Sequence, residues 1–189
     1  MRRVLLIGAL LLVANACSLP VLAQDSGAKA AVKPAPSPSQ SVLDTWNDVG
    51  RKLIAMAEDF PEDKYDFKPT PAERSFSQQL THAAGANYFF TNLVLGEKPP
   101  TEEDMKKEIK TKAEMVTFVK KAISDGADVI KKKGDKGMND MIVDPFSKQQ
   151  TRVGDFAYGF AEHMGEHYGQ LVVYYRLSGL VPPESRPKK

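Results

Sequence analysis

Residues 151–178 read "TRVGDFAYGFAEHMGEHYGQLVVYYRLS", and the spacing of side chains in this stretch decides the fold class. Seven residues recur at steps of three or four, which is the period of one helix face. They are Val153, Phe156, Phe160, His163, His167, Leu171 and Tyr174. Gly179 and Pro182 follow, and both residue types end helices. We therefore predict a helix over residues 151–178 with two histidines on its inward face.

Three other segments show the same helical periodicity. Ser75 and Gln78 have the capping-box pattern that satisfies the free amides of a first turn, and so have Thr111 and Glu114. The predicted helices cover residues 41–60, 75–95 and 111–134. Four amphipathic helices without a convincing strand predict an all-α fold, a four-helix bundle.

The connections between these helices differ in character. Residues 61–74 contain three prolines, so we expect an extended connection there. Residues 134–150 contain glycine, asparagine and proline, and we expect them to be irregular. Within them, residues 141–143 are expected to be extended without forming a sheet.

The N-terminus has the layout of a secretory signal peptide over residues 1–23. Arg2 and Arg3 precede an apolar run over residues 4–13, and a small-residue cleavage site ends at Ala23. The apolar run is too short to remain as a membrane-spanning helix, so we expect no transmembrane segment in the mature chain. The expected location is the periplasm or the exterior of the cell.

Cys17 offers a second route of export. The stretch "VANAC" (residues 13–17) resembles a lipoprotein cleavage box, although Ala14 stands where leucine is usual. The alternative location is therefore a lipid anchor through Cys17. On either route the folded part keeps no cysteine, so a metal would need nitrogen or oxygen ligands.

Composition and charge limit the partners of the mature protein. Residues 24–40 are rich in alanine, proline and serine, and we interpret them as a flexible linker before a domain over residues 41–186. The leader holds two arginines and no acidic residue, so its removal lowers the net charge from +2 to zero. A neutral protein has no global field for nucleic acid, so we expect no nucleic-acid partner. The expected partner is a small-molecule substrate, whose identity the sequence does not reveal. A homodimer stays compatible with the sequence.

The three histidines of the chain all fall at core-facing positions of two helices. His163 and His167 are four residues apart, so both imidazoles can reach one ion. His82 lies on the second predicted helix beside Ala83 and Ala84, which leave room for its ring. Three buried imidazoles would need three separate hydrogen-bond partners, whereas one divalent cation satisfies them together. Hydrogen-bonded core histidines are the alternative to this metal site.

The fragment from His163 to His167 also fits the H-x-x-E-H pattern of one class of zinc peptidases. Those enzymes take a third, carboxylate ligand far downstream, and only 22 residues follow His167 here. Glu166 is adjacent to His167 and points about a quarter turn away from it. We therefore expect an outer or surface role for Glu166, which remains the weak candidate for a catalytic proton-transfer group.

Three segments together resemble the DinB-like superfamily of bacterial four-helix bundles. They are "EDFPEDKYDFKPTP" (residues 58–71), "SFSQQLTHAAGA" (residues 75–86) and "EHMGEHYGQLVVYYRLSGLVPPESR" (residues 162–186). The resemblance implies a divalent metal, zinc or nickel, held by His82, His163 and His167 with open coordination positions. Some relatives transfer low-molecular-weight thiols, which are mainly cytoplasmic compounds.

Two functions from different classes follow from this resemblance. One is an exported metal-dependent hydrolase or thiol-transferase-like enzyme with an open three-histidine site. The other is a non-catalytic metal- or ligand-binding module of the cell envelope. A purely structural bundle without metal is the third hypothesis, and it predicts a stability that chelators leave unchanged.

Overall fold

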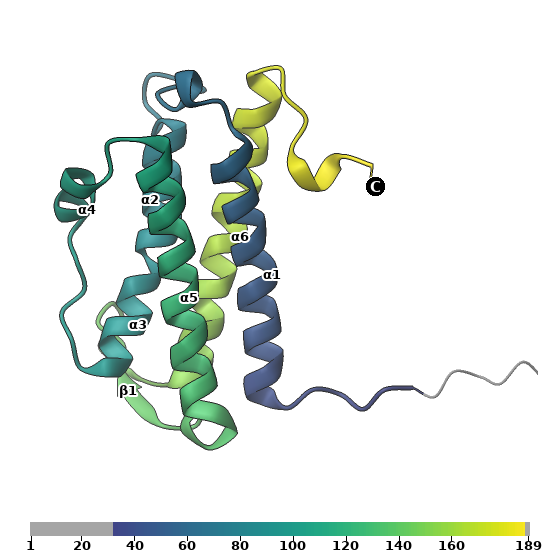
Figure 1. Ribbon diagram of the computed structural model, residues 1–189. Helices are drawn as coiled ribbons and strands as arrows, with labels where there is room; N and C mark the ends of the chain where they lie inside the picture. The colour runs from purple at the N-terminus through teal and green to yellow at the C-terminus, as the bar shows by residue number, and fades with distance from the viewer. Residues whose placement is uncertain (1–31, 188–189) are drawn as a thin grey trace, which may run out of the picture. The chain divides into compact units, whose positions relative to one another are not determined.

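Four long helical segments pack side by side in the computed structural model, which describes residues 32–187 (Figure 1). They are α1 (Pro38–Asp59), the bent pair α2 (Phe76–Gly85) and α3 (Asn87–Leu95), α5 (Lys112–Gly137) and α6 (Val153–Leu177). The shorter elements are η1 (Glu62–Lys64), α4 (Glu102–Glu108), β1 (Met141–Val143), β2 (Gln150–Arg152) and η2 (Pro183–Ser185). The predicted four-helix bundle is therefore confirmed. The predicted signal peptide and residues 24–31 of the predicted linker lie outside the described residues.

Helix α1 begins three residues before the predicted start at residue 41. Ser37 has extended backbone angles, and its hydroxyl accepts a hydrogen bond from the backbone amide of Gln40 at 3.4 Å. Pro38 then fills the first turn, where its missing amide hydrogen is no loss. The last residues of the predicted linker are therefore helical.

Within residues 32–187, each helix is too short or too polar to span a membrane.

The predicted helix over residues 75–95 is two helices, α2 and α3, with a break at Ala86. The capping box of Ser75 and Gln78 is present, and Gly96 ends α3 with φ of 75°. Gly85 precedes the break, and a Cβ on it would lie 2.5 Å from the sulfur of Met105. The bare backbone at Gly85 is thus the space into which Met105 of α4 packs, and this contact holds α4 against α2.

The prediction of no sheet between α5 and α6 is wrong. Strands β1 and β2 form an antiparallel hairpin in which Met141 pairs with Arg152 and Val143 with Gln150. Each strand has three residues, too few for an alternating pattern to be recognised in the sequence. Helix α5 also continues to Gly137 beyond its predicted end, although Gly134 does interrupt the helical backbone with φ of 56°.

The hairpin loop, residues 144–149, is held by one carboxylate. Asp144 accepts hydrogen bonds from the backbone amide of Phe146 at 2.8 Å and from the hydroxyl of Ser147 at 2.6 Å. Phe146 itself is 65% exposed, and its ring centroid lies 5.6 Å from that of Phe89 on α3. The loop therefore presents an aromatic side chain next to the second helical segment.

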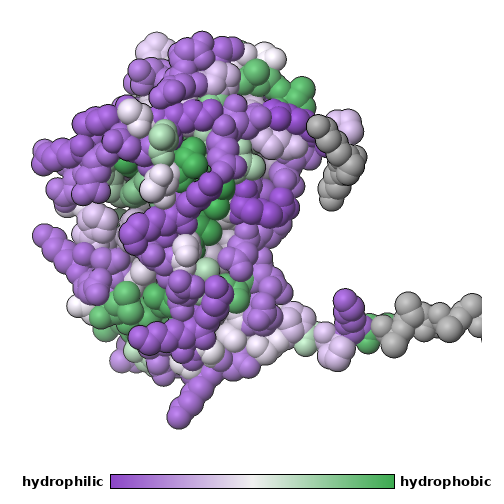
Figure 2. Space-filling model, viewed as in Figure 1, coloured by the Kyte–Doolittle hydropathy of each residue, from purple (hydrophilic) through white to green (hydrophobic). Residues whose placement is uncertain are grey.

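The core lies between the predicted apolar faces of the four segments. Trp46 on α1 is fully buried, and its indole N–H donates to the carbonyl of Ile123 on α5 at 2.9 Å. At the other end of the bundle, the rings of Phe60 and Phe76 stack with centroids 3.7 Å apart, and Tyr175 of α6 packs at their edge. Helices α2 and α6, which carry the histidines, are thus fixed to α1 through buried aromatic rings. Outside this core, the surface in the view of Figure 2 is mostly hydrophilic.

Candidate metal centre

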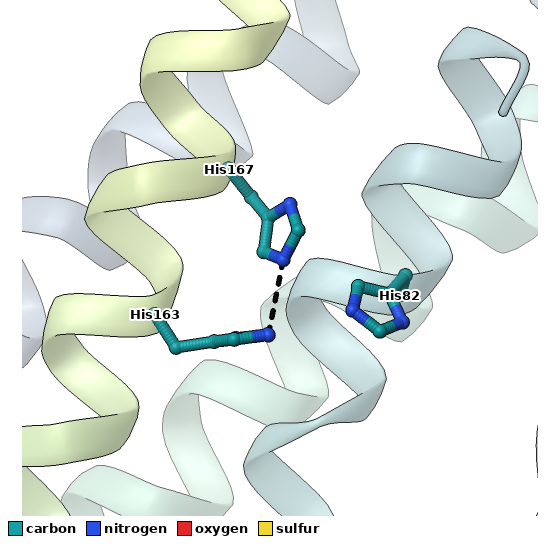
Figure 3. A group of neighbouring side chains, drawn as sticks. All are labelled: His82, His163 and His167. Atoms are coloured by element: carbon teal, nitrogen blue, oxygen red, sulfur yellow. Dashed lines mark hydrogen bonds between the residues drawn. The ribbon is translucent and has the colours of Figure 1, made fainter. Parts of the chain in front are cut away.

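The three imidazoles point toward one another from two helices (Figure 3). His82 comes from the last turn of α2, and His163 and His167 come from successive turns of α6. One nitrogen of each ring can be chosen so that all three lie within 4.8 Å of one another. The structure therefore brings together all three histidines that the sequence indicated.

The spacing and the chemistry of these nitrogens fit a divalent ion. Nε2 of His163 lies 3.0 Å from Nε2 of His167. Two nitrogens bound to one tetrahedral zinc ion at about 2.1 Å are about 3.4 Å apart, so small rotations of the rings suffice. Neutral imidazoles are ligands that suit zinc, nickel and copper. Nδ1 of His163 is buried without a hydrogen-bond partner in residues 32–187, so this ring makes its polar contact through Nε2.

Two glutamines fix the orientation of His167. Oε1 of Gln170 lies 3.0 Å from Nδ1 of His167 and accepts its hydrogen, which leaves the lone pair of Nε2 facing the other histidines. Gln79, which is buried, donates from its amide nitrogen to Oε1 of Gln170. The same amide nitrogen lies 2.6 Å from Nδ1 of His167, so Gln79 acts on the ring through Gln170. The three side chains form one network behind the ring.

The carboxylate of Glu102 orients His82 as Gln170 orients His167, through Nδ1 of the ring. Nδ1 of His82 lies 3.2 Å from Oε1 of Glu102, and hydrogen bonding to His82 lowers the pKa of that carboxyl group. Glu102 is the first residue of α4, and its place is set by the capping box of Thr101 and Asp104. Helix α4 therefore contributes to the candidate site through a carboxylate–histidine pair, an arrangement common behind metal ligands.

The sequence placed the amide of Gln170 next to the site, but it did not indicate Gln79 or Glu102 as partners of the histidines. Gln79 lies three residues before His82 and Gln170 three residues after His167, so each shares a helix face with a histidine. That spacing was the available signal for the glutamines. For Glu102 the sequence offered no such spacing, because its approach to His82 depends on how α4 packs.

Burial keeps the imidazoles on α6 neutral. Desolvation lowers the pKa of His163 to about 4, and the neighbouring charges of His167, His82 and Arg74 act in the same direction. Desolvation also lowers the pKa of His167, against an opposing contribution from its hydrogen bond to Gln170. Neutral imidazole is the form that binds metal, so protons compete weakly for these two nitrogens at pH 7.

We expect the metal-free protein to lose stability as the pH falls from about 6.5 to about 4. In this window an unfolded chain binds a proton on His163 that the folded chain does not, so the free energy of unfolding falls with pH. The shift corresponds to about 2 kcal/mol once solvent contact at the partly exposed ring is allowed for. The measurement is urea denaturation of chelator-treated protein at pH 4 and pH 7.

The His163→Gln variant is the control for that experiment, because carboxyl groups also titrate near pH 4. We expect the difference in unfolding free energy between pH 4 and pH 7 to be smaller in this variant. An equal difference in both proteins would show that His163 is not held neutral by the fold.

Glu166 lies on the exposed side of α6. Its carboxylate acts on His167 through charge, in the direction that raises the pKa of that imidazole, and it is not a member of the histidine group. This is the position that the sequence led us to expect for Glu166.

The fold and the histidine group define a helical bundle with a centre that can hold a divalent metal. Residues 45–171 match the sequence model of the DinB superfamily, and the chain belongs to this superfamily. Nine chains of known structure match it. One is described as "YfiT from Bacillus subtilis is a probable metal-dependent hydrolase with an unusual four-helix bundle topology"; the TM-score is 0.60 at 16% identity, over 79% of this chain and 94% of that chain. The sequence matches no protein with a curated description.

Proposed function

We propose that this protein is a metal-dependent hydrolase in which His82, His163 and His167 hold one zinc or nickel ion. The observation that carries the proposal is the convergence of three imidazoles from α2 and α6, two of which, His82 and His163, line a cavity. The description of YfiT as a probable metal-dependent hydrolase supports the reaction class. A bound divalent ion would supply Lewis acidity, which activates water at neutral pH.

The surrounding residues have distinct tasks in this proposal. Gln170 and Gln79 hold the ring of His167 so that Nε2 faces the centre, and Glu102 does the same for His82. Imidazole binds a metal in its neutral form, so three histidine ligands would leave the net positive charge of a bound ion, which would supply Lewis acidity toward a carbonyl or phosphoryl group. Glu166, being exposed, stays the reserve group for proton exchange with solvent.

Two alternatives use the same three histidines. Thiol transfer would use the ion to stabilise a bound thiolate, and a non-catalytic envelope module would hold the ion or a ligand without turnover. We favour hydrolysis over thiol transfer because the leader indicates export, away from the cytoplasmic thiols. The proposal of export itself depends on residues 1–23. Determination of the first residue of the mature protein tests it: Gln24 would indicate cleavage of a signal peptide after Ala23, and a lipidated Cys17 would indicate a lipid anchor.

The test is a metal-dependent hydrolysis assay on full-length protein. Chelator-treated protein is reconstituted with one equivalent of zinc or nickel and given a panel of activated esters, amides and phosphoesters. We expect turnover of one class to rise at least about 100-fold on reconstitution, because activated water is the nucleophile. Azide should compete, since an open coordination position accepts it.

A fully loaded protein that neither turns over any class nor binds azide would contradict hydrolysis. That outcome would favour the non-catalytic module, in which the coordination positions are closed.

A further inference from the structure

A cavity of about 450 Å³ adjoins the histidine cluster on the side of α4. His82 and His163 form part of its wall, and Glu102, which faces His82, has the only formal charge among its lining residues in the described chain. The rest of the wall is largely apolar, and its larger members are Ala86, Phe89, Pro100, Met105, Phe146 and Phe160. We call this space the aromatic pocket.

The space beside the glutamines that contact His167 has a different character. A groove of about 640 Å³ is lined there by Glu73, Arg74, Gln79, Gln170 and Tyr174, among others. Gln79 and Gln170 contact Nδ1 of His167, so this groove lies next to the glutamines and includes no imidazole in its wall. Of the two spaces, only the aromatic pocket is lined by histidines, so an apolar part of a substrate beside His82 and His163 is favoured there.

We propose that the substrate carries a bulky, uncharged apolar group beside the bond that reacts, and that this group occupies the aromatic pocket. The inference rests on the proposed function for the reaction and adds its substrate class: compounds with an aryl or branched alkyl substituent next to the reacting bond. Size supports it, since a cavity of about 150 Å³ already accommodates a benzene ring. Desolvation supports it too, because burial of apolar surface against these walls is the main favourable term they offer.

Phe146 lines the mouth of the aromatic pocket, where a bound ligand would bury part of its exposed ring. It is 65% exposed, and the hydrogen bonds to Asp144 hold its loop beside Phe89. A substituent packed against the exposed face of Phe146 would cover apolar surface that is now in contact with water, which lowers the free energy of the complex. An exposed aromatic side chain at a pocket mouth is explained by such a ligand.

Gly159 provides a sharp test, because it lines the pocket from α6 and a Cβ at this position meets nothing within 4 Å. Gly159→Leu therefore fills the pocket while improving helix propensity. Gly169→Leu is the matched control: it lies on the same helix, is exposed, and has the same free space around its Cβ. Both variants should fold and bind metal as the wild type does.

The first readout is the binding of two hydroxamates to the metal-loaded proteins by calorimetry. We expect 4-phenylbenzohydroxamate to bind about 30-fold more tightly than acetohydroxamate to wild type and to Gly169→Leu. In Gly159→Leu the ratio should fall below about 3-fold, because the pocket is filled. A ratio near one in wild type, or an unchanged ratio in Gly159→Leu, would overturn the inference.

The second readout needs no metal and no turnover. 2-Naphthol is titrated into metal-free protein while the methyl resonance of Met105, a pocket residue, is followed by NMR. The resonance should shift in Gly169→Leu and not in Gly159→Leu, and absence of a shift in Gly169→Leu would overturn the inference. If this response is present while metal-dependent hydrolysis is absent, the proposed reaction fails and the aromatic pocket stands.

Discussion

The His163→Ala variant is expected to lose stoichiometric metal. Its imidazole is one of the three converging rings: Nε2 lies 3.0 Å from Nε2 of His167, and its ring centroid lies 5.3 Å from that of His82. Removal of an outer partner of a metal ligand lowers affinity about 10- to 100-fold, so the loss of a ligand should lower it by more than about 100-fold. Elemental analysis after dialysis against a weak chelator measures the effect.

Glu166→Gln is the matched control, because Glu166 is exposed on the same helix and adjacent to His167. This variant should retain one ion per chain. His163→Gln serves as a second variant that preserves side-chain volume, so a poorly folded alanine variant would not confuse the result. One ion per chain in both His163 variants would show that the metal, if any, binds elsewhere.

The helices could be predicted from the sequence because their signals are local. The line from Val153 to Tyr174 has a helical period, and the capping boxes at Ser75 and Thr111 mark starts that the structure reproduces. The meeting of three histidines followed from the same periodicity, since two core-facing stripes of one bundle must meet. These features depend on spacing within one segment and on the rule that apolar faces pack together.

What the sequence did not predict depends on contacts between distant segments. Glu102 reaches His82 because Met105 packs against Gly85, and neither the pair nor the contact has a local signature. Phe146 reaches Phe89 because a hairpin forms from two three-residue strands. The imidazole cluster was therefore accessible from the sequence, whereas its outer partners and its pocket required the structure.

The site also depends on a frame that contains none of its residues. Helices α1 and α5 approach so closely that two glycines are needed between them: a Cβ on Gly50 would lie 2.5 Å from a methyl group of Ile123, and one on Gly126 would lie 2.0 Å from the ring of Trp46. Helix α1 in turn holds α2 and α6 through Phe60. A change in the distance between α1 and α5 should therefore alter the packing of α2 and α6 as well.

Gly126→Ala is expected to destabilise the protein by about 3 kcal/mol or more, although alanine is the better helix former by about 1 kcal/mol. The added methyl group would overlap the ring of Trp46, which is fully buried and tied to the carbonyl of Ile123 by its indole N–H. The ring cannot move aside without loss of that hydrogen bond and of close packing. Urea denaturation of the metal-free protein measures the change in unfolding free energy.

Gly169→Ala makes the same chemical change within another helix, at an exposed position where a Cβ meets nothing within 4 Å. Only the propensity effect applies there, so this variant should be stabilised by up to about 1 kcal/mol. The opposite signs separate packing from propensity, because every other difference between glycine and alanine is shared. Similar changes in both variants would mean that the α1–α5 contact yields easily, and the close approach at Gly126 would then not explain why glycine is needed there.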